Sequence, residues 1–186
     1  EDKKEDQKTM EEEIPHIVTG TTQEAIDSFF AISIRKGWQG VAYLLLQNGF
    51  NKMEAIKDAL NENQFRYVLA LMTKIQDAIL RNIDYKGQNL FHVFAVKGKE
   101  APFDLTTRIF DGLLMRGVDF KLQDSIGRTP LHYAAESNFH FLENKLLENG
   151  CNPNVKDNRG DTPFIIALQS YRFDISRLEK YFSYKA

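Results

Sequence analysis

Two histidines in the C-terminal half are the side chains best suited to chemistry, because they recur at one position of a repeated motif. His92 follows Asn89 by three residues, and His132 follows Thr129 by the same spacing. An imidazole can bind a metal ion or transfer a proton, but a metal site needs further Cys, His or carboxylate ligands at characteristic spacing. The sequence places no such ligand near either histidine. We therefore expect both histidines to be structural and no metal to bind.

Three aspartates recur in the same way, as Asp84, Asp124 and Asp157, and a glycine follows each of them by three residues. Two neighbouring carboxylates can serve as a general acid and a general base. However, Asp-x-x-Gly is typical of a turn, in which the carboxylate accepts backbone N–H groups and glycine supplies a positive φ. We expect these aspartates to stabilise turns and not to act in catalysis.

Signatures of enzymes and of cofactor sites are missing from the sequence. It contains neither of the glycine-rich phosphate-binding motifs, G-x-x-x-x-G-K-[ST] and G-x-G-x-x-G, and neither G-x-S-x-G nor H-E-x-x-H. Cys151 is the single cysteine, so no internal disulfide can form, and we expect a packed, unreactive thiol in an intracellular, reducing compartment. These observations predict no catalytic residue, no cofactor and no enzymatic activity.

Composition and charge describe an ordinary globular chain. Its 186 residues carry a formal net charge of −2, with 42% hydrophobic and 27% charged residues. Near-neutral charge argues against a nucleic-acid-binding protein, and no apolar run reaches the ~18 residues that a membrane span requires. Residues 1–13 are almost entirely charged or polar, so we expect a disordered tail or linker there.

A repeat with a period of 33 residues organises the C-terminal half. The segment 124–134 recurs as 157–167 with the same Asp, Gly, Thr, Pro and Ala positions, and Leu-Leu-x-x-Gly ends at both Gly117 and Gly150. A third copy begins 40 residues upstream, at Asp84, so seven residues are inserted; we place them in 97–103. A stack of such units buries the apolar face that one unit alone leaves exposed.

The sequence pattern of each repeat predicts a turn, a helix, a second turn and a second helix. Thr129 and Thr162 stand where a helix N-cap belongs, and a proline follows each at the first helical position. Gly117 and Gly150 suit the left-handed conformation just beyond a helix end.

The segments 127–135 and 146–154 resemble an ankyrin repeat. The resemblance is specific in 124–156, good in 157–182 and moderate in 84–123. It implies an all-α, ankyrin-type helical solenoid of about five stacked helix pairs, with His132 bonded to a neighbouring turn. Ile165 departs from the family pattern because it replaces the corresponding histidine.

The N-terminal half, 14–83, predicts degenerate helical pairs that pack on the array. Apolar spacing indicates helices over 21–36, 41–48, 54–60 and 65–79, and Thr21-x-x-Glu24 fits a capping box at the start of the first one. At the other end, the spacing predicts that Ile175, Leu178 and Phe182 face inward.

The resemblance implies that a partner protein or peptide binds a concave face formed by turn tips and first helices. The positions that it assigns to this face are Tyr85, Lys86, Gln88, Val93, Ser125, Ile126, Arg128, Tyr133, Asn158, Arg159, Asp161 and Ile166. Ile126 and Tyr133 are candidate hot spots, because they place an apolar tip and an aromatic side chain on the same groove wall, and aromatic side chains anchor interfaces. Alternatively, Tyr133 and Ile166 pack against adjacent repeats.

We therefore expect a monomeric protein-interaction module. The alternative is a regulatory or targeting arm of a larger protein, such as a poly(ADP-ribose) polymerase or a channel. The start at Glu1 instead of Met fits a domain excised from a longer chain, or a processed one.

Overall fold

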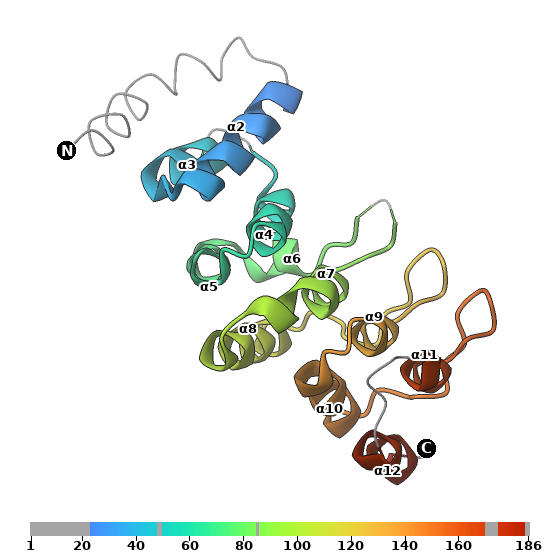
Figure 1. Ribbon diagram of the computed structural model, residues 1–186. Helices are drawn as coiled ribbons and strands as arrows, with labels where there is room; N and C mark the ends of the chain where they lie inside the picture. Colours follow the sequence, from blue (N-terminus) through green and yellow to red (C-terminus); the bar gives the residue numbers. More distant parts are fainter. Residues whose placement is uncertain (1–22, 48–49, 85, 170–174, 185–186) are drawn as a thin grey trace. The chain divides into compact units, whose positions relative to one another are not determined.

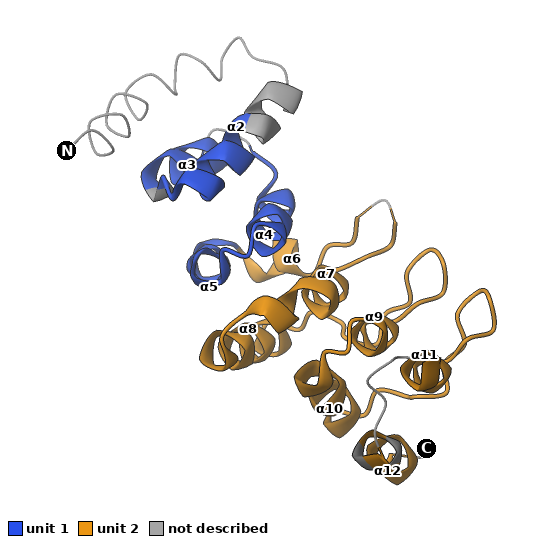
Figure 2. Ribbon diagram, in the orientation of Figure 1, with its two compact units in different colours: residues 1–75 blue, residues 76–186 orange. Residues whose placement is uncertain are grey.

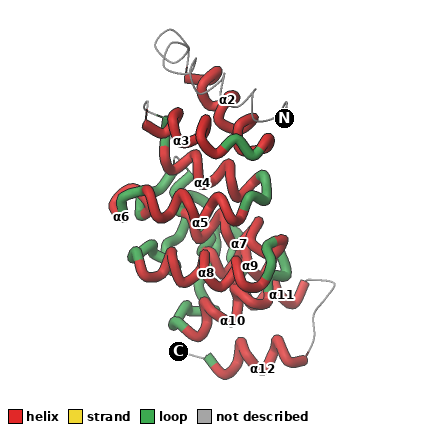
Figure 3. Tube along the Cα trace, turned by 90° about the vertical axis from the view of Figure 1, so that its left-hand side faces the viewer, coloured by secondary structure: helices red, strands yellow, loops and turns green. Residues whose placement is uncertain are grey.

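The computed structural model describes residues 23–47, 50–84, 86–169 and 175–184. All regular structure in these ranges is helical and no strand occurs in them, which confirms the predicted fold class (Figure 3). The expected tail, the capping box at Thr21 and the candidate residue Tyr85 lie outside the described residues. The chain divides into two compact units, residues 1–75 and residues 76–186 (Figure 2).

The first unit contains two helix pairs. They are α2 (Gln23–Lys36) with α3 (Gln39–Gln47), and α4 (Lys52–Asn61) with α5 (Phe65–Lys74). Helix α2 packs against α3 and α4, and α4 packs against α5. The rings of Phe30 and Phe50 stack in its core with centroids 4.1 Å apart, and Phe30 and Ile34 are buried as the apolar spacing predicts.

The helix predicted over 65–79 is wrong in one respect, since it is two helices. Helix α5 ends at Lys74, Ile75 and Gln76 adopt extended backbone, and the short helix α6 (Asp77–Leu80) follows. The break contains no Gly or Pro, and the apolar pattern continues through it because Ile75 and Leu80 are both buried. Periodicity alone therefore predicts an uninterrupted helix.

The second unit contains three helix pairs. They are α7 (Leu90–Lys97) with α8 (Phe103–Met115), α9 (Pro130–Glu136) with α10 (His140–Glu148), and α11 (Pro163–Gln169) with α12 (Ile175–Ser183). The first helices α7, α9 and α11 lie side by side, and the loop that precedes each of them projects to the same side (Figure 1). The described residues thus form five helix pairs, two in one unit and three in the other.

The seven inserted residues lengthen helices more than they lengthen a loop. Helix α8 has 13 residues where α10 has nine, and α7 has eight where α9 has seven. The rest falls in the connection, which contains the 3-10 helix η1 (Gly98–Glu100). A Cβ at Gly98 would collide with the rings of Phe94 and Phe139, so the connection passes close to the core where only glycine fits.

The predicted inward face of the last helix is wrong at Ile175, which is 74% exposed. Phe182 is 50% exposed, although its ring centroid lies 5.5 Å from that of Phe164 in α11, whereas Arg177 and Tyr181 are buried. The α12 sequence carries two candidate faces, and a charged side chain occupies the inward one because a buried carboxylate pairs with it. The side chain of Leu178 lies outside the described residues.

Candidate protein-interaction surface

Three turns precede the first helices, and an aspartate organises each of them. The Oδ1 atom of Asp84, Asp124 and Asp157 accepts the backbone N–H groups of the second and fourth residues that follow, over 2.8–3.1 Å. The glycine three residues after each aspartate has φ between 74° and 87°, which favours glycine strongly. The predicted turn role of these aspartates is confirmed.

Backbone hydrogen bonds join each turn to the next. Ser125 N–H donates to the Lys86 carbonyl over 2.8 Å, and Asn158 N–H donates to the Ile126 carbonyl over 3.0 Å. Since consecutive turns are bonded near their tips, the tip side chains are held at a fixed spacing along the second unit.

Both repeated histidines form a hydrogen bond to a backbone carbonyl in the turn of the next repeat. Nε2 of His92 lies 3.2 Å from the Arg128 carbonyl oxygen, and Nε2 of His132 lies 3.3 Å from the Asp161 carbonyl oxygen. In each case Nδ1 accepts the N-cap backbone N–H, so Nε2 is left to donate. Burial lowers the pKa of both histidines, although the bonded carbonyls oppose it. The expected structural role is confirmed. Ile165, which stands at the same position of the last repeat, is exposed.

Tyr133 is bonded within the array. Its hydroxyl donates to Oδ2 of Asp124 over 2.6 Å, and the Gln88 side-chain amide donates to the same Oδ2 over 3.1 Å and to the Tyr133 oxygen over 2.9 Å. Burial by itself would raise the pKa of Asp124, but the hydrogen bonds from Tyr133, Gln88 and the turn amides hold it below its ordinary value. Burial and Asp124 together raise the pKa of Tyr133.

Arg128 is also engaged within the chain. Its Nε donates to Oδ2 of Asp157 over 3.1 Å, and its Nη1 donates to Oε2 of Glu136 over 3.0 Å. The guanidinium lies over the Tyr133 ring, 5.7 Å from the centroid. Arg128 therefore joins two successive turns and is not an open anchor for a partner carboxylate.

The predicted site residues divide into an inner and an outer set. Ile166 is buried, and Gln88, Val93, Arg128, Tyr133 and Asp161 are partly buried, so the alternative of packing within the array fits Tyr133 and Ile166. The exposed set, which we call the tip row, consists of Lys86, Ser125, Ile126, Asn158 and Arg159.

The sequence analysis did not predict that the Gln123 side chain joins two turns by hydrogen bonds. Its side-chain amide donates to the Gly127 carbonyl over 2.8 Å and to the Lys156 carbonyl over 3.3 Å. Lysine stands at the equivalent position 33 residues later, so the repeat pattern itself offers no signal for this role. In the described part of the chain, no group of three or more His, Cys, Asp or Glu is placed to hold a metal ion.

Comparison with protein families identifies the repeated segment. The sequence profile described as ankyrin repeats (3 copies) matches residues 94–178. This segment belongs to the ankyrin-repeat family. Ankyrin repeats are generally protein-interaction modules, and the helix–turn–helix units of the second unit correspond to them.

The relatives that match are ankyrin-repeat proteins of different kinds. The chain is 26% identical over 123 residues to NF-kappa-B inhibitor alpha of Mus musculus, which is 63% of this chain and 38% of that relative. It is 32% identical over 75 residues to potassium channel AKT2/3 of Arabidopsis thaliana, covering 40% of this chain and 9% of the channel. It is 33% identical over 75 residues to the ADP-ribosylation factor GTPase-activating protein AGD4 of Arabidopsis thaliana, with the same coverage. The chain thus spans well under two thirds of these relatives.

The ankyrin turns place chemically varied side chains in the tip row. Ile126 is apolar and 48% exposed, Ser125 and Asn158 are polar, and Lys86 and Arg159 are basic. Such a row can bury an apolar side chain and pair with carboxylates, as interfaces do. None of the helices in the described ranges is long and apolar enough to cross a bilayer.

Proposed function

We propose that the chain is a non-catalytic protein-interaction module that binds a segment of a partner protein along the tip row and the adjoining first helices, the concave face of the ankyrin array. The partner segment carries an apolar side chain that covers Ile126, and a carboxylate for Arg159. Tyr133 and Arg128 support this surface from beneath instead of contacting the partner.

The observation that carries this proposal is the hydrogen-bonded ladder of turns. Lys86 to Ser125 and Ile126 to Asn158 are joined through backbone atoms, so the tip row is ordered before any partner arrives. A surface that is already ordered loses little conformational entropy on binding. The name of one relative, NF-kappa-B inhibitor alpha, also describes a protein that acts on another protein.

Site-specific photo-crosslinking tests the proposal. A benzoylphenylalanine residue replaces Ile126 in the intact chain, and a matched variant carries it in place of Met115, an exposed apolar residue at the end of α8. We expect a discrete protein adduct from position 126 and none from position 115. Equal adducts from both positions would indicate general stickiness and contradict the assignment.

Affinity measurements with the crosslinked partner follow. Ile126→Asp should weaken its binding by roughly 30-fold, because truncating or charging a hot spot costs about 2 kcal/mol or more. Met115→Asp should leave affinity unchanged, and both variants should unfold in urea like the wild-type chain. An unchanged affinity for Ile126→Asp would exclude the tip row.

A second candidate function is that of a regulatory or targeting arm within a larger protein. The alignment with the potassium channel and with the GTPase-activating protein covers only 9% of each relative, so the aligned segment is a small part of both. The open reading frame that encodes residues 1–186 tests this idea. A continuous frame that encodes a channel or an enzyme domain would support it, and stop codons on both sides would refute it.

We also propose that the chain acts as a monomer inside the cell, without binding nucleic acid or a membrane. The near-neutral charge and the buried thiol of Cys151 support this assignment. Sedimentation at micromolar concentrations should give the mass of one chain, 21.5 kDa, and a doubled mass would refute the monomer.

A further inference from the structure

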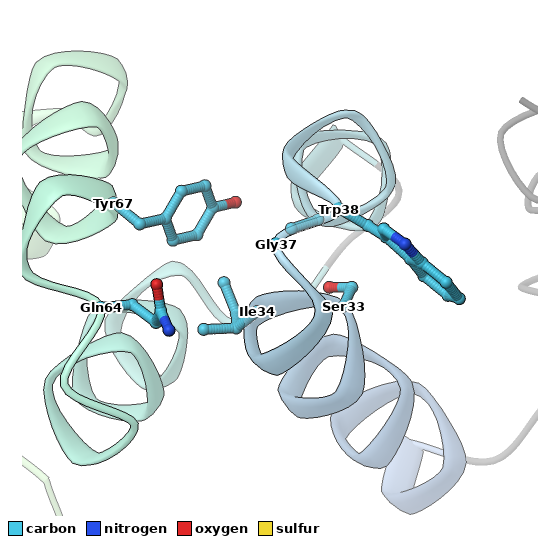
Figure 4. Close-up of a pocket in the computed structure, with 7 residues that line it drawn as sticks. Ser33, Ile34, Gly37, Trp38, Gln64 and Tyr67 are labelled. Carbon is cyan, nitrogen blue, oxygen red and sulfur yellow. The ribbon is translucent and has the colours of Figure 1, made fainter. Parts of the chain in front are cut away.

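The pocket beside Tyr67 in the first unit is too small to hold a side chain of a partner. It offers about 20 Å³ between the turn that joins α2 to α3 and the beginning of α5 (Figure 4). That volume accommodates about one water molecule, which suffices for the buried Tyr67 hydroxyl, an atom without a hydrogen-bond partner among the described residues. We assign no ligand to this pocket.

The outer side of α11, the last of the first helices, is apolar and open. Phe164 is partly exposed, Ile165 is 36% exposed and Leu168 is 43% exposed. Since Leu168 follows the other two by four and three residues, the three side chains form one stripe along the helix, which we call the outer stripe. The equivalent residues are buried in both earlier repeats: Leu131, His132 and Ala135 on α9, and Phe91, His92 and Ala95 on α7.

In the earlier repeats, this side of the first helix packs against the next first helix. Helix α9 packs on α7 and α11 packs on α9, and Figure 1 shows α11 as the last member of that row. The ring of His92 lies edge-on to that of Tyr133 on α9, with centroids 5.8 Å apart. The outer stripe therefore continues an interface that the array already uses twice, and none of the helices in the described ranges covers it.

An apolar end is unusual for a helical array. A terminal repeat ordinarily presents a polar outer face, because nothing packs on it and the chain must stay soluble. Phe182 of α12 is 50% exposed, and its ring centroid lies 5.5 Å from that of Phe164, so the apolar surface extends beyond α11. Apolar side chains gathered at this end indicate that a further element covers them, since burial of apolar surface is favourable.

Two departures from the repeat pattern show what kind of element fits, and the first is Ile165. At its position His92 and His132 lie with Nε2 3.2 Å and 3.3 Å from a carbonyl oxygen of the next turn. Ile165 has no hydrogen to donate to such a carbonyl. The outer stripe thus offers no polar group to the turn of a further repeat, and it suits apolar side chains instead.

The second departure is Asp161, just before α11. At its position Gln88 and Arg128 each donate to Oδ2 of the aspartate in the next turn, over 3.1 Å in both cases. A carboxylate cannot donate and repels another carboxylate, so a further turn of the Asp-x-x-Gly type does not fit here. The Asp161 side chain is partly buried, and it forms no ion pair within the described ranges. A basic side chain is what this position would attract.

We propose that the outer stripe binds an amphipathic helix of a partner protein, which lies alongside α11 as α11 lies alongside α9. The apolar side of that helix covers Ile165 and Leu168, and a lysine or arginine at the end nearest Asp161 pairs with its carboxylate. The inference concerns the end of the array and does not depend on the tip row.

A synthetic helix serves as the probe. It is a peptide of about 14 residues with leucines at helical spacing on one side, lysines at both ends and a fluorescein label, and fluorescence anisotropy follows its binding to the intact chain. A scrambled peptide of the same composition spreads the leucines around the helix, and a third peptide carries glutamates in place of the lysines. We expect saturable binding of the lysine probe and at least roughly tenfold weaker binding of the two controls.

Four variants of the chain locate the probe. Leu168→Asp should weaken the lysine probe by roughly tenfold or more, because binding would bury a charge against leucines. Met115→Asp, the same change at an exposed apolar residue of α8, and Ile126→Asp in the tip row should leave it unchanged, which keeps this test separate from the proposal for the tip row. Asp161→Lys should reverse the preference, so that the glutamate probe binds more tightly than the lysine probe. Urea unfolding checks that each variant stays folded.

Several results would overturn the proposal. Absence of saturable binding, or equal binding of the lysine and scrambled peptides, would mean that the outer stripe does not recognise an amphipathic helix. An unchanged affinity for Leu168→Asp would place the probe elsewhere on the chain, and an unchanged preference for Asp161→Lys would remove the charge pairing. Sedimentation that gives a doubled mass for the wild-type chain and a single mass for Leu168→Asp would assign the stripe to a second copy of this chain.

Discussion

Glu143 on α10 and Arg177 on α12 form a buried ion pair, with Nε of Arg177 2.9 Å from Oε2 of Glu143. The Nη2 atom of Arg177 contacts the other carboxylate oxygen, which makes the pair bidentate. Arg177 also donates to the Ala135 carbonyl over 3.0 Å and to Oδ1 of Asn138 over 3.1 Å. Burial raises the pKa of Glu143, and Arg177 opposes that shift. The ion pair therefore attaches α12 to the preceding helix pair, α9 with α10.

Removing one partner of this pair should be costly. Arg177→Met leaves a buried carboxylate without its counter-charge, and we expect the free energy of unfolding to fall by about 3–5 kcal/mol. Urea denaturation at pH 7 measures it. Lys180→Met, an exposed substitution on the same helix, should have little effect. The double variant Glu143→Leu with Arg177→Met should recover most of the loss, and an unchanged loss would contradict our account.

The Tyr133 hydroxyl should stabilise the second turn. Tyr133→Phe removes the donor to Asp124 and leaves the rest of the ring contacts, so we expect a loss of about 1 kcal/mol in the free energy of unfolding. The same change should raise the pKa of the Asp124 carboxyl, because one stabilising hydrogen bond is gone. Carboxyl-selective NMR titration measures that pKa, and Tyr184→Phe at an exposed tyrosine serves as the control.

The buried histidines should make the array sensitive to mild acid. Burial depresses the folded-state pKa of His132 below its ordinary value of 6.5, so below about pH 6.5 the unfolded chain binds the proton more readily. The stability that neutral His132 contributes is thus present above pH 6.5 and is lost as pH falls through the folded-state pKa. Unfolding at pH 7.5 and pH 5.5 should show a smaller difference for His132→Gln than for wild type. An equal difference would mean that His132 titrates freely in the fold.

Cys151 should resist alkylation in the folded chain. Burial raises the pKa of its thiol to about 12, and its Sγ contacts the Phe120 carbonyl at 3.4 Å. Because the thiolate is the reactive form, iodoacetamide at pH 8 should react at least roughly 100-fold more slowly than in the urea-unfolded chain. Similar rates in both states would show that the thiol is open to solvent.

The turns of the array could be predicted from sequence because they depend on neighbouring residues. Asp124, Gly127 and Thr129 act within one short segment, and each takes the conformation that its residue type favours. The pairing of Glu143 with Arg177 joins residues 34 positions apart, and no local pattern signals it. The apolar spacing on α12 favoured Ile175 instead, and that residue is exposed.

The candidate interaction surface was predictable in outline but not in detail. The position of each residue within the repeat assigned Ile126, Tyr133 and Ile166 to one face, but that position does not tell whether a side chain is buried. Exposure depends on packing against other parts of the chain, and Ile166 is buried whereas Ile126 is 48% exposed. The pocket beside Tyr67 lies in the degenerate half, where no repeat phase guides the choice of residues.

The hydrogen bonds between successive turns restrict how such a protein can change its recognition properties. An extra residue in the turn of Ile126 would shift its carbonyl away from the Asn158 amide and disturb two neighbouring loops at once. Altered specificity is therefore reached more readily by replacing tip side chains than by lengthening the loops. A library randomised at positions 125, 126, 158 and 159 with loop length held constant would leave the supporting framework intact.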